Sequence, residues 1–218
     1  MKYSIVIPAY LINARLVNLT SKCIQSLRET LDCDYEIIVV NSGHLDLDDE
    51  VDTYVKLNKQ ATFAQAVNIG IRIATGALVA VCNNDVVLPQ GWVGAIDKTL
   101  LEGATVATLL SSEEDRLPFD ETLEDFFGSF WVMSKINFNK VGLMDEQFKN
   151  SFGDADYWMR IRLLGGKILK NCNVIVEHVA RASVDLDKPK HDEWYIKNRE
   201  LFNLKWKGSE DPWFQRLK

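Results

Sequence analysis

Short apolar runs alternate in the first half of the chain with segments whose apolar residues recur at helical spacing. The runs predict strands at Tyr3–Pro8, Tyr35–Val40, Asp52–Leu57, Ala77–Cys82 and Thr105–Leu110. The segments between them predict helices at Asn13–Leu31, Thr62–Thr75 and Gly91–Leu101. Strands that are apolar nearly throughout and alternate with helices are typical of parallel sheets covered on both faces. We therefore predict an α/β fold with a mostly parallel central sheet.

The pattern in the second half is less regular. The polar, acidic segment Ser111–Glu124 predicts a loop. The elements expected after it are a strand at Phe126–Ser134, a short helix at Lys135–Gly142, a helix at Asp154–Leu164, an extended segment at Ile168–Val179 and a final helix at Pro189–Lys207. No repeat, low-complexity segment or break in composition marks a linker, so we expect residues 1–218 to form a single domain.

Composition excludes several classes of protein. A hydrophobic fraction of 47% with 26% charged residues indicates a globular chain rather than a disordered one. No apolar run is long enough to span a bilayer, and Pro8 interrupts the opening residues before a signal peptide could form. The net charge of −6 argues against a nucleic-acid partner. The cysteines lack C-x-x-C spacing, so we expect reduced thiols in a cytoplasmic protein: Cys23, Cys33, Cys82 and Cys172.

Ligands of parallel α/β sheets bind beyond the carboxyl ends of the strands. That rule points to three segments: Pro8-Ala9-Tyr10, Asn41-Ser42-Gly43 and Asn83-Asn84-Asp85. The carboxylate of Asp85 could hold a divalent cation, which in turn would hold a pyrophosphate, while the neighbouring amides could bind ribose. Taken alone, the third segment is better explained as an ordinary turn rich in Asn and Asp.

Two further signals lie in the second half. Asp154 and Asp156 begin a predicted helix, where carboxylates either cap the backbone or, for one of the two, act as a general base. His178 ends an extended segment on a face that is otherwise apolar. It is either a hydrogen-bonded core histidine, or a neutral imidazole that binds a metal or donates to phosphate.

Five segments, taken in order, resemble motifs of one known family: YSIVIPAY, EIIVVNSG, FAQAVNIGIRIATG, VAVCNNDVVLPQGW and VGLMDEQFKNSFGDADYWMRIRLLGGKI. From Tyr3 to about Ser183 the chain resembles family-2 glycosyltransferases of the GT-A fold, and within them the rhamnosyltransferase-like subgroup. The resemblance implies a nucleotide-sugar-binding half at residues 1–110, an acceptor and catalytic half at 111–188 and a C-terminal helical extension at 189–218.

The resemblance also assigns roles to single residues. The residues that match nucleotide-binding positions are Pro8, Ala9, Tyr10, Asn41, Asn68, Asn83 and Asn84. Asn41 stands where an acidic residue usually reads the base, and Asn83 replaces the first carboxylate of the D-x-D motif. Asp85 and His178 match the metal and phosphate site. Asp154 matches the base of a Glu-Asp pair whose glutamate is Gly153 in this chain.

The activity implied is inverting transfer of a sugar, as in polysaccharide biosynthesis. The donor would be a nucleotide-diphosphate sugar, and the acceptor a hydroxyl of a glycan, lipid-linked glycan or protein, with Mn²⁺ or Mg²⁺ as cofactor. Three alternatives remain: a nucleotidylyltransferase, a non-catalytic nucleotide-sugar-binding domain and a nucleotide-sugar hydrolase. The first lacks its expected Gly-rich phosphate loop after Tyr3–Pro8.

The final predicted helix carries aromatic residues on one face, namely Tyr195, Phe202 and Trp206. One interpretation is that this face packs on the core. The other is that the helix makes a peripheral membrane contact and brings the enzyme to a lipid-linked acceptor, helped by basic residues: Lys197, Arg199, Lys205 and Lys207. The sequence makes no prediction of oligomeric state.

Overall fold

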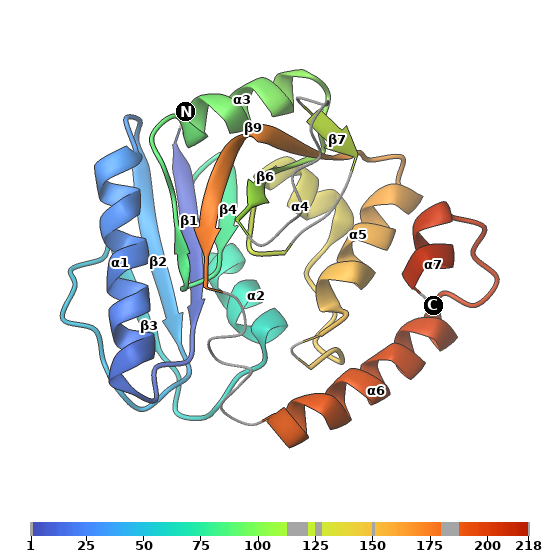
Figure 1. The fold of residues 1–218 in the computed structure, drawn as a ribbon, viewed down its shortest axis with the longest axis horizontal. Coiled ribbons are helices and arrows are strands. Elements are labelled where there is room, and N and C mark those ends of the chain that lie inside the picture. Colours follow the sequence, from blue (N-terminus) through green and yellow to red (C-terminus); the bar gives the residue numbers. More distant parts are fainter. Residues whose placement is uncertain (1, 113–121, 125–127, 150, 180–187, 218) are drawn as a thin grey trace.

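The structure, a computed structural model, describes residues 2–112, 122–124, 128–149, 151–179 and 188–217 (Figure 1). Its elements in chain order are β1 (Tyr3–Ala9), α1 (Ala14–Thr30), β2 (Tyr35–Asn41), β3 (Thr53–Lys56), α2 (Phe63–Ile73), β4 (Leu78–Cys82), β5 (Val86–Val87), α3 (Trp92–Leu101), β6 (Val106–Ser111), β7 (Thr122–Glu124), β8 (Phe130–Ser134), α4 (Lys135–Val141), α5 (Gly153–Leu163), β9 (Ile168–His178), α6 (Lys188–Lys205) and α7 (Pro212–Leu217). The predicted helices and the longer strands are therefore confirmed, with ends that differ by a few residues.

The strands of the described residues form a mixed sheet in the order β3-β2-β1-β4-β8-β6-β9-β5, with β7 paired to β9. β1, β2, β3 and β4 are parallel neighbours, and β6 is parallel to β9. β8 is inserted antiparallel between β4 and β6, so β4, β6 and β9 still run in the same direction. The carboxyl ends of β1, β2, β4 and β9 consequently meet at one edge, as the prediction of a mostly parallel sheet requires.

Two short strands were not expected from the sequence. β5 follows the Asn83–Asp85 turn, and β7 lies within the segment Ser111–Glu124 that the polarity pattern assigned to a loop. Both pair antiparallel with β9. The loop prediction is wrong for Thr122–Glu124, because so short a strand is defined by its partner rather than by its own composition; residues 113–121 lie outside the described residues.

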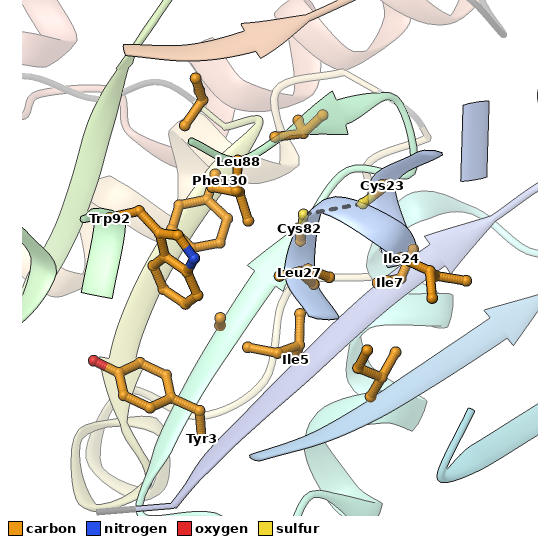
Figure 2. Packing of buried hydrophobic residues seen from close by; sticks show 14 of the residues in the cluster. Tyr3, Ile5, Ile7, Cys23, Ile24, Leu27, Cys82, Leu88, Trp92 and Phe130 are labelled. Atoms are coloured by element: carbon orange, nitrogen blue, oxygen red, sulfur yellow. Dashed lines mark hydrogen bonds between the residues drawn. The ribbon is translucent and has the colours of Figure 1, made fainter. Parts of the chain in front are cut away.

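Alternate side chains of the strands build two separate cores. Tyr3, Ile5 and Ile7 of β1 pack under α1 and α3, whereas Val6 faces α2 on the other side of the sheet, where α4 and α5 also pack. Figure 2 shows the first core, in which the ring of Trp92 stands edge-on to those of Tyr3 and Phe130, with centroid distances of 5.7 and 5.1 Å. This period-two alternation produces the helices on both faces that the sequence predicted.

The C-terminal helices form a third cluster, on the side of α5 away from the sheet (Figure 1). Phe202 of α6 and Phe214 of α7 are buried against Phe148, Ala155 and Met159. The aromatic face of the final helix therefore packs on the protein, as the first interpretation expected.

Contact of α6 with a membrane stays a prediction. The solvent-facing side of α6 exposes Ile196 and Leu204, but also Glu193 and Glu200, which an anionic surface would repel. No helix among the described residues has the length and apolar character needed to cross a bilayer. The four cysteines are free thiols, and Cys23 lies next to Cys82 with 3.6 Å between the sulfur atoms (Figure 2).

A buried carboxylate connects the amino ends of the strands. Glu36 of β2 accepts hydrogen bonds from the hydroxyl of Ser4 and from both the amide and hydroxyl of Thr75, and Lys2 lies 3.7 Å away. Burial by itself would raise the pKa of Glu36, but these donors outweigh it and lower the pKa from 4.5 to about 2. The ionised form is therefore favoured in the folded state, and Glu36 stabilises the fold above pH 4.5.

This stabilisation is expected to disappear as the pH falls from 4.5 toward 2, since the unfolded chain takes up the proton first. Glu36→Gln should lose about 2 to 3 kcal/mol of unfolding free energy at neutral pH, an amount that allows for some solvent screening. Urea unfolding across a pH series measures the effect, with the exposed Glu50→Gln as the matched control. Parallel stability curves for the wild type and Glu36→Gln between pH 2 and pH 5 would contradict the assignment.

Candidate functional site

The end of β9 brings His178 to Asp85. Val86 of β5 pairs with His178, and the amide of Val179 donates to the carbonyl of Asp85 at 3.0 Å. The Nε2 atom of His178 then lies 3.1 Å from Oδ1 of Asp85, and the two side chains are only 9% and 10% exposed. The two residues predicted as metal ligands are therefore neighbours at the carboxyl edge of the sheet, although nearly a hundred residues separate them in the chain.

The donor set at this point suits a hard divalent cation that also binds phosphate. Asp85 offers a carboxylate and His178 an imidazole, and the buried Oδ1 of Asn83 has no hydrogen-bond partner among the described residues. No group of three His, Cys, Asp or Glu side chains with metal-binding geometry occurs in the described part of the chain. Mg²⁺ and similar ions are commonly held by one or two carboxylates together with substrate phosphates and water, so these residues fit a cation that arrives with a diphosphate.

Asp154 lies in the first turn of α5 as a half-buried carboxylate. The amide of Ala155 donates to its Oδ1 at 2.8 Å. Burial raises the pKa of Asp154 above the ordinary 3.8, and the backbone hydrogen bonds only partly oppose this effect. A carboxylate with a raised pKa accepts a proton more readily than an exposed aspartate does, which favours the general-base interpretation.

A turn that the sequence did not single out joins Asp154 to the Asn83–Asp85 segment. The amide of Asn83 donates to the carbonyl of Ser129 at 2.8 Å. A Cβ atom on the adjacent Gly128 would lie 2.9 Å from Oδ2 of Asp154, so this carboxylate occupies the space that the glycine leaves open. Gly128 and Ser129 thus lie between the Asn83–Asp85 turn and the candidate base. The sequence analysis placed both residues inside the strand predicted at Phe126–Ser134, whereas β8 begins at Phe130.

Asp156 has a different environment from Asp154. Its carboxylate is fully buried and accepts hydrogen bonds from Arg160 at 3.2 Å and from the indole of Trp206 at 3.0 Å, and Lys205 lies 2.9 Å away. The sequence analysis expected at most one of the two aspartates to face a site. The structure assigns Asp156 to an internal ion-pair network, which leaves Asp154 as the candidate base.

The predicted nucleotide-binding residues of β1 and β2 lie side by side at the carboxyl edge. Pro8 and Ala9 are buried, Tyr10 is half-buried, and Ala9 pairs with Asn41. The side chain of Asn41 is fully buried and accepts from the amides of Leu11 and Gly43, while it donates to the Leu45 carbonyl and the Tyr54 hydroxyl. Asn41 therefore shapes the loops around this edge, and direct contact with a base stays a prediction.

Asn68 and Asn84 also have partners inside the protein. Asn68 of α2 binds both the amide and the carbonyl of Met144 at 2.9 Å, and two residues further on a Cβ at Gly70 would lie only 2.2 Å from the side chain of Val6. The N-x-G motif thus attaches α2 to β1 and to the segment before α5. Asn84 donates to Thr20 of α1 at 2.8 Å. A role in nucleotide binding stays a prediction for both asparagines.

Comparisons with known proteins address the family and the fold. The family model described as glycosyl transferase family 2 matches residues 4–162. A crystal structure of GalNAc-T7 with UDP, GalNAc and Mn²⁺ is similar, with a TM-score of 0.69 and 14% identity over 82% of this chain and 44% of that one. At this identity the likeness shows the fold alone, and the present chain spans less than half of the GalNAc-T7 chain. None of the curated proteins compared matches the sequence.

Proposed function

The chain belongs to glycosyltransferase family 2, and from this membership we propose that it moves a sugar from a nucleoside-diphosphate sugar to an acceptor hydroxyl, with inversion at the anomeric carbon. The predicted GT-A fold is confirmed. One observation carries the proposal: the Asp85–His178 pair and the half-buried Asp154 flank the same Gly128–Ser129 turn. Residues 1–110 would bind the donor and residues 111–188 the acceptor; assignment to a rhamnosyltransferase-like subgroup stays a prediction.

The diphosphate of the donor would lie at the Asp85–His178 pair. These two side chains, with the Oδ1 atom of Asn83 nearby in the chain, would hold Mn²⁺ or Mg²⁺. The cation, when bound, supplies positive charge that stabilises the leaving nucleoside diphosphate. GalNAc-T7, which shares the fold, was crystallised with UDP and Mn²⁺, and this supports the proposal.

Asp154 would take the proton from the acceptor. A sugar hydroxyl becomes acidic only as its oxygen bonds to the electron-poor anomeric carbon, so a carboxylate within hydrogen-bond reach is a sufficient base. The raised pKa of Asp154 strengthens it for this task, and the missing side chain at Gly128 makes room for its Oδ2 beside the turn. The acceptor proposed is a glycan or a lipid-linked glycan.

Diphosphate binding is expected to depend on a divalent cation. Nucleoside diphosphates titrated by calorimetry should bind at least about tenfold more weakly in excess chelator than in Mn²⁺, because the cation bridges phosphate and protein. Asp85→Asn should lose most of this difference. Asp32→Asn, exposed at the amino end of β2, is the matched control. Equal affinity with Mn²⁺ and with chelator would contradict the proposed metal site.

A turnover assay tests the function itself. The protein is incubated with a panel of nucleotide sugars, with and without Mn²⁺, and with and without candidate acceptors. Acceptor-dependent release of nucleoside diphosphate together with a glycosylated product supports the transferase. Free sugar formed at the same rate without any acceptor would indicate a hydrolase. Binding of a nucleotide sugar without turnover of any donor in the panel would indicate a non-catalytic domain.

A further inference from the structure

Helix α6 lies beyond the part of the chain that the family model matches, yet it binds the segment that leads into α5. The side chain of Asn198 is almost fully buried. Its Nδ2 donates to the carbonyl of Lys149 at 2.8 Å and to the carbonyl and hydroxyl of Ser151 at 3.0 and 2.9 Å, and its Oδ1 accepts from the amide of Lys149 at 3.4 Å. One side chain of α6 thus binds the backbone of two residues just before the catalytic helix.

The residue between this segment and α5 has an unusual backbone conformation. Phe152 has a φ of 60°, and among the described residues it is the one non-glycine residue with positive φ. It occupies the N-cap position of α5 without a side-chain hydrogen bond to the helix. A bulky residue without a polar tip persists in the left-handed region only where its surroundings enforce it.

The surroundings that enforce this conformation come from α6. The ring of Phe152 packs against Tyr195 and Phe202, with centroid distances of 5.2 and 5.4 Å. The carbonyl of Phe152 accepts from the amide of Asp156 at 2.9 Å, so the backbone of Phe152 sets the direction in which α5 begins. Asp154 follows two residues later, and its position therefore depends on how Phe152 is held.

We propose that α6 is a positioning clamp for Asp154, in which Asn198, Tyr195 and Phe202 hold Lys149, Ser151 and Phe152 so that the carboxylate faces Gly128 and the acceptor. The proposal rests on the proposed function, since it takes Asp154 as the base. These α6 residues are positioning residues that do not touch the substrate. Lys205 at the end of α6 and the next residue, Trp206, contact Asp156 and provide a second attachment of this part of the chain to α5.

Two variants weaken the clamp to different degrees. Asn198→Ala removes the hydrogen bonds to Lys149 and Ser151, and Tyr195→Ala removes one ring from Phe152. Tyr195 is 45% exposed, so its truncation leaves the fold largely intact and keeps the test valid if Asn198→Ala folds poorly. Both should lower kcat by about 10- to 100-fold, because small displacements of a catalytic group have effects of this size. The KM for the donor and the affinity for nucleoside diphosphate should stay near the wild-type values.

Asn203→Ala is the matched control, because Asn203 lies on the same helix and none of the hydrogen bonds to Lys149 or Ser151 involves it. A double-mutant cycle with Asp154→Asn separates positioning from general stability. If Asn198 acts through Asp154, Asn198→Ala leaves the residual rate of Asp154→Asn nearly unchanged. If Asn198→Ala lowers the rate by the same factor in the wild type and in Asp154→Asn, the clamp proposal alone is overturned. A loss of donor affinity instead of kcat overturns it as well. Full activity of Asp154→Asn overturns the base assignment and the clamp with it.

Discussion

Asp154→Asn is expected to lower turnover by about 10²- to 10⁴-fold while the affinity for the nucleotide sugar stays nearly unchanged. The asparagine has the same shape, and its side-chain oxygen can still accept the hydrogen bond from Ala155. What it lacks is the ability to take a proton from the acceptor hydroxyl. Steady-state kinetics with a nucleotide-sugar donor measures the rate, and calorimetry with the matching nucleoside diphosphate measures binding.

The pH dependence of the wild type provides a second readout. Turnover should fall as the pH drops through the pKa of the base, and this fall should begin above the ordinary aspartate value of 3.8 because burial raises the pKa of Asp154. Asp154→Asn should lack this acid limb. Normal transfer by Asp154→Asn, with loss of transfer in correctly folded Asp156→Asn, would show that Asp156 is the base.

The fold was predictable because its signals are local. β1, β2 and β4 are apolar runs whose alternate side chains fill two cores, and α1 and α2 carry apolar stripes next to clear N-caps. Such patterns depend on residues within one element. The two strands that the sequence did not predict, β5 and β7, exist because β9 passes beside them, and that pairing joins segments far apart in the chain.

The arrangement of the candidate site was predictable in part, and for a related reason. The strand-end rule and the family resemblance placed Asp85, His178 and Asp154 in one site, since each lies at the end of a recognisable element. The sequence could not indicate that Asn41 and Asn68 would be occupied by internal hydrogen bonds. Those partners come from loops whose course is set by tertiary packing.

The role of α6 was also out of reach of pattern analysis. Its aromatic stripe correctly predicted the burial of Phe202, although Tyr195 is 45% exposed. Which surface the stripe covers depends on how α5 is oriented. The contacts of Asn198 with the backbone before α5 involve residues almost fifty positions apart, and no spacing rule connects them. The sequence pattern could not single out Gly128 either, because this glycine matters through its closeness to Asp154 in space and not through its neighbours in the chain.

Asp156→Ala is expected to lower the unfolding free energy by about 3 to 5 kcal/mol, the usual cost of removing one partner from a buried ion pair. The carboxylate of Asp156 is fully buried between Arg160 of its own helix and Lys205 of α6. Its loss leaves the Arg160 guanidinium, also partly buried, without its carboxylate partner, and it removes the acceptor of the Trp206 indole. The attachment of α6 to α5 should weaken as a result.

Urea unfolding followed by tryptophan fluorescence measures this loss, and Asp32→Ala, at an exposed loop position, should change stability by about 0.5 kcal/mol or less. The loss of unfolding free energy for Asp156→Asn should lie between those of Asp156→Ala and Asp32→Ala. The side-chain oxygen of the asparagine can still accept the hydrogen bond from Trp206, but the charge is gone. Lys205 also binds Asp145 at 2.6 Å, which gives it a second partner and limits the cost on the α6 side. Exposed ion pairs contribute up to about 1 kcal/mol to stability. If Asp156→Ala loses less than this amount of unfolding free energy, the network does not anchor α6.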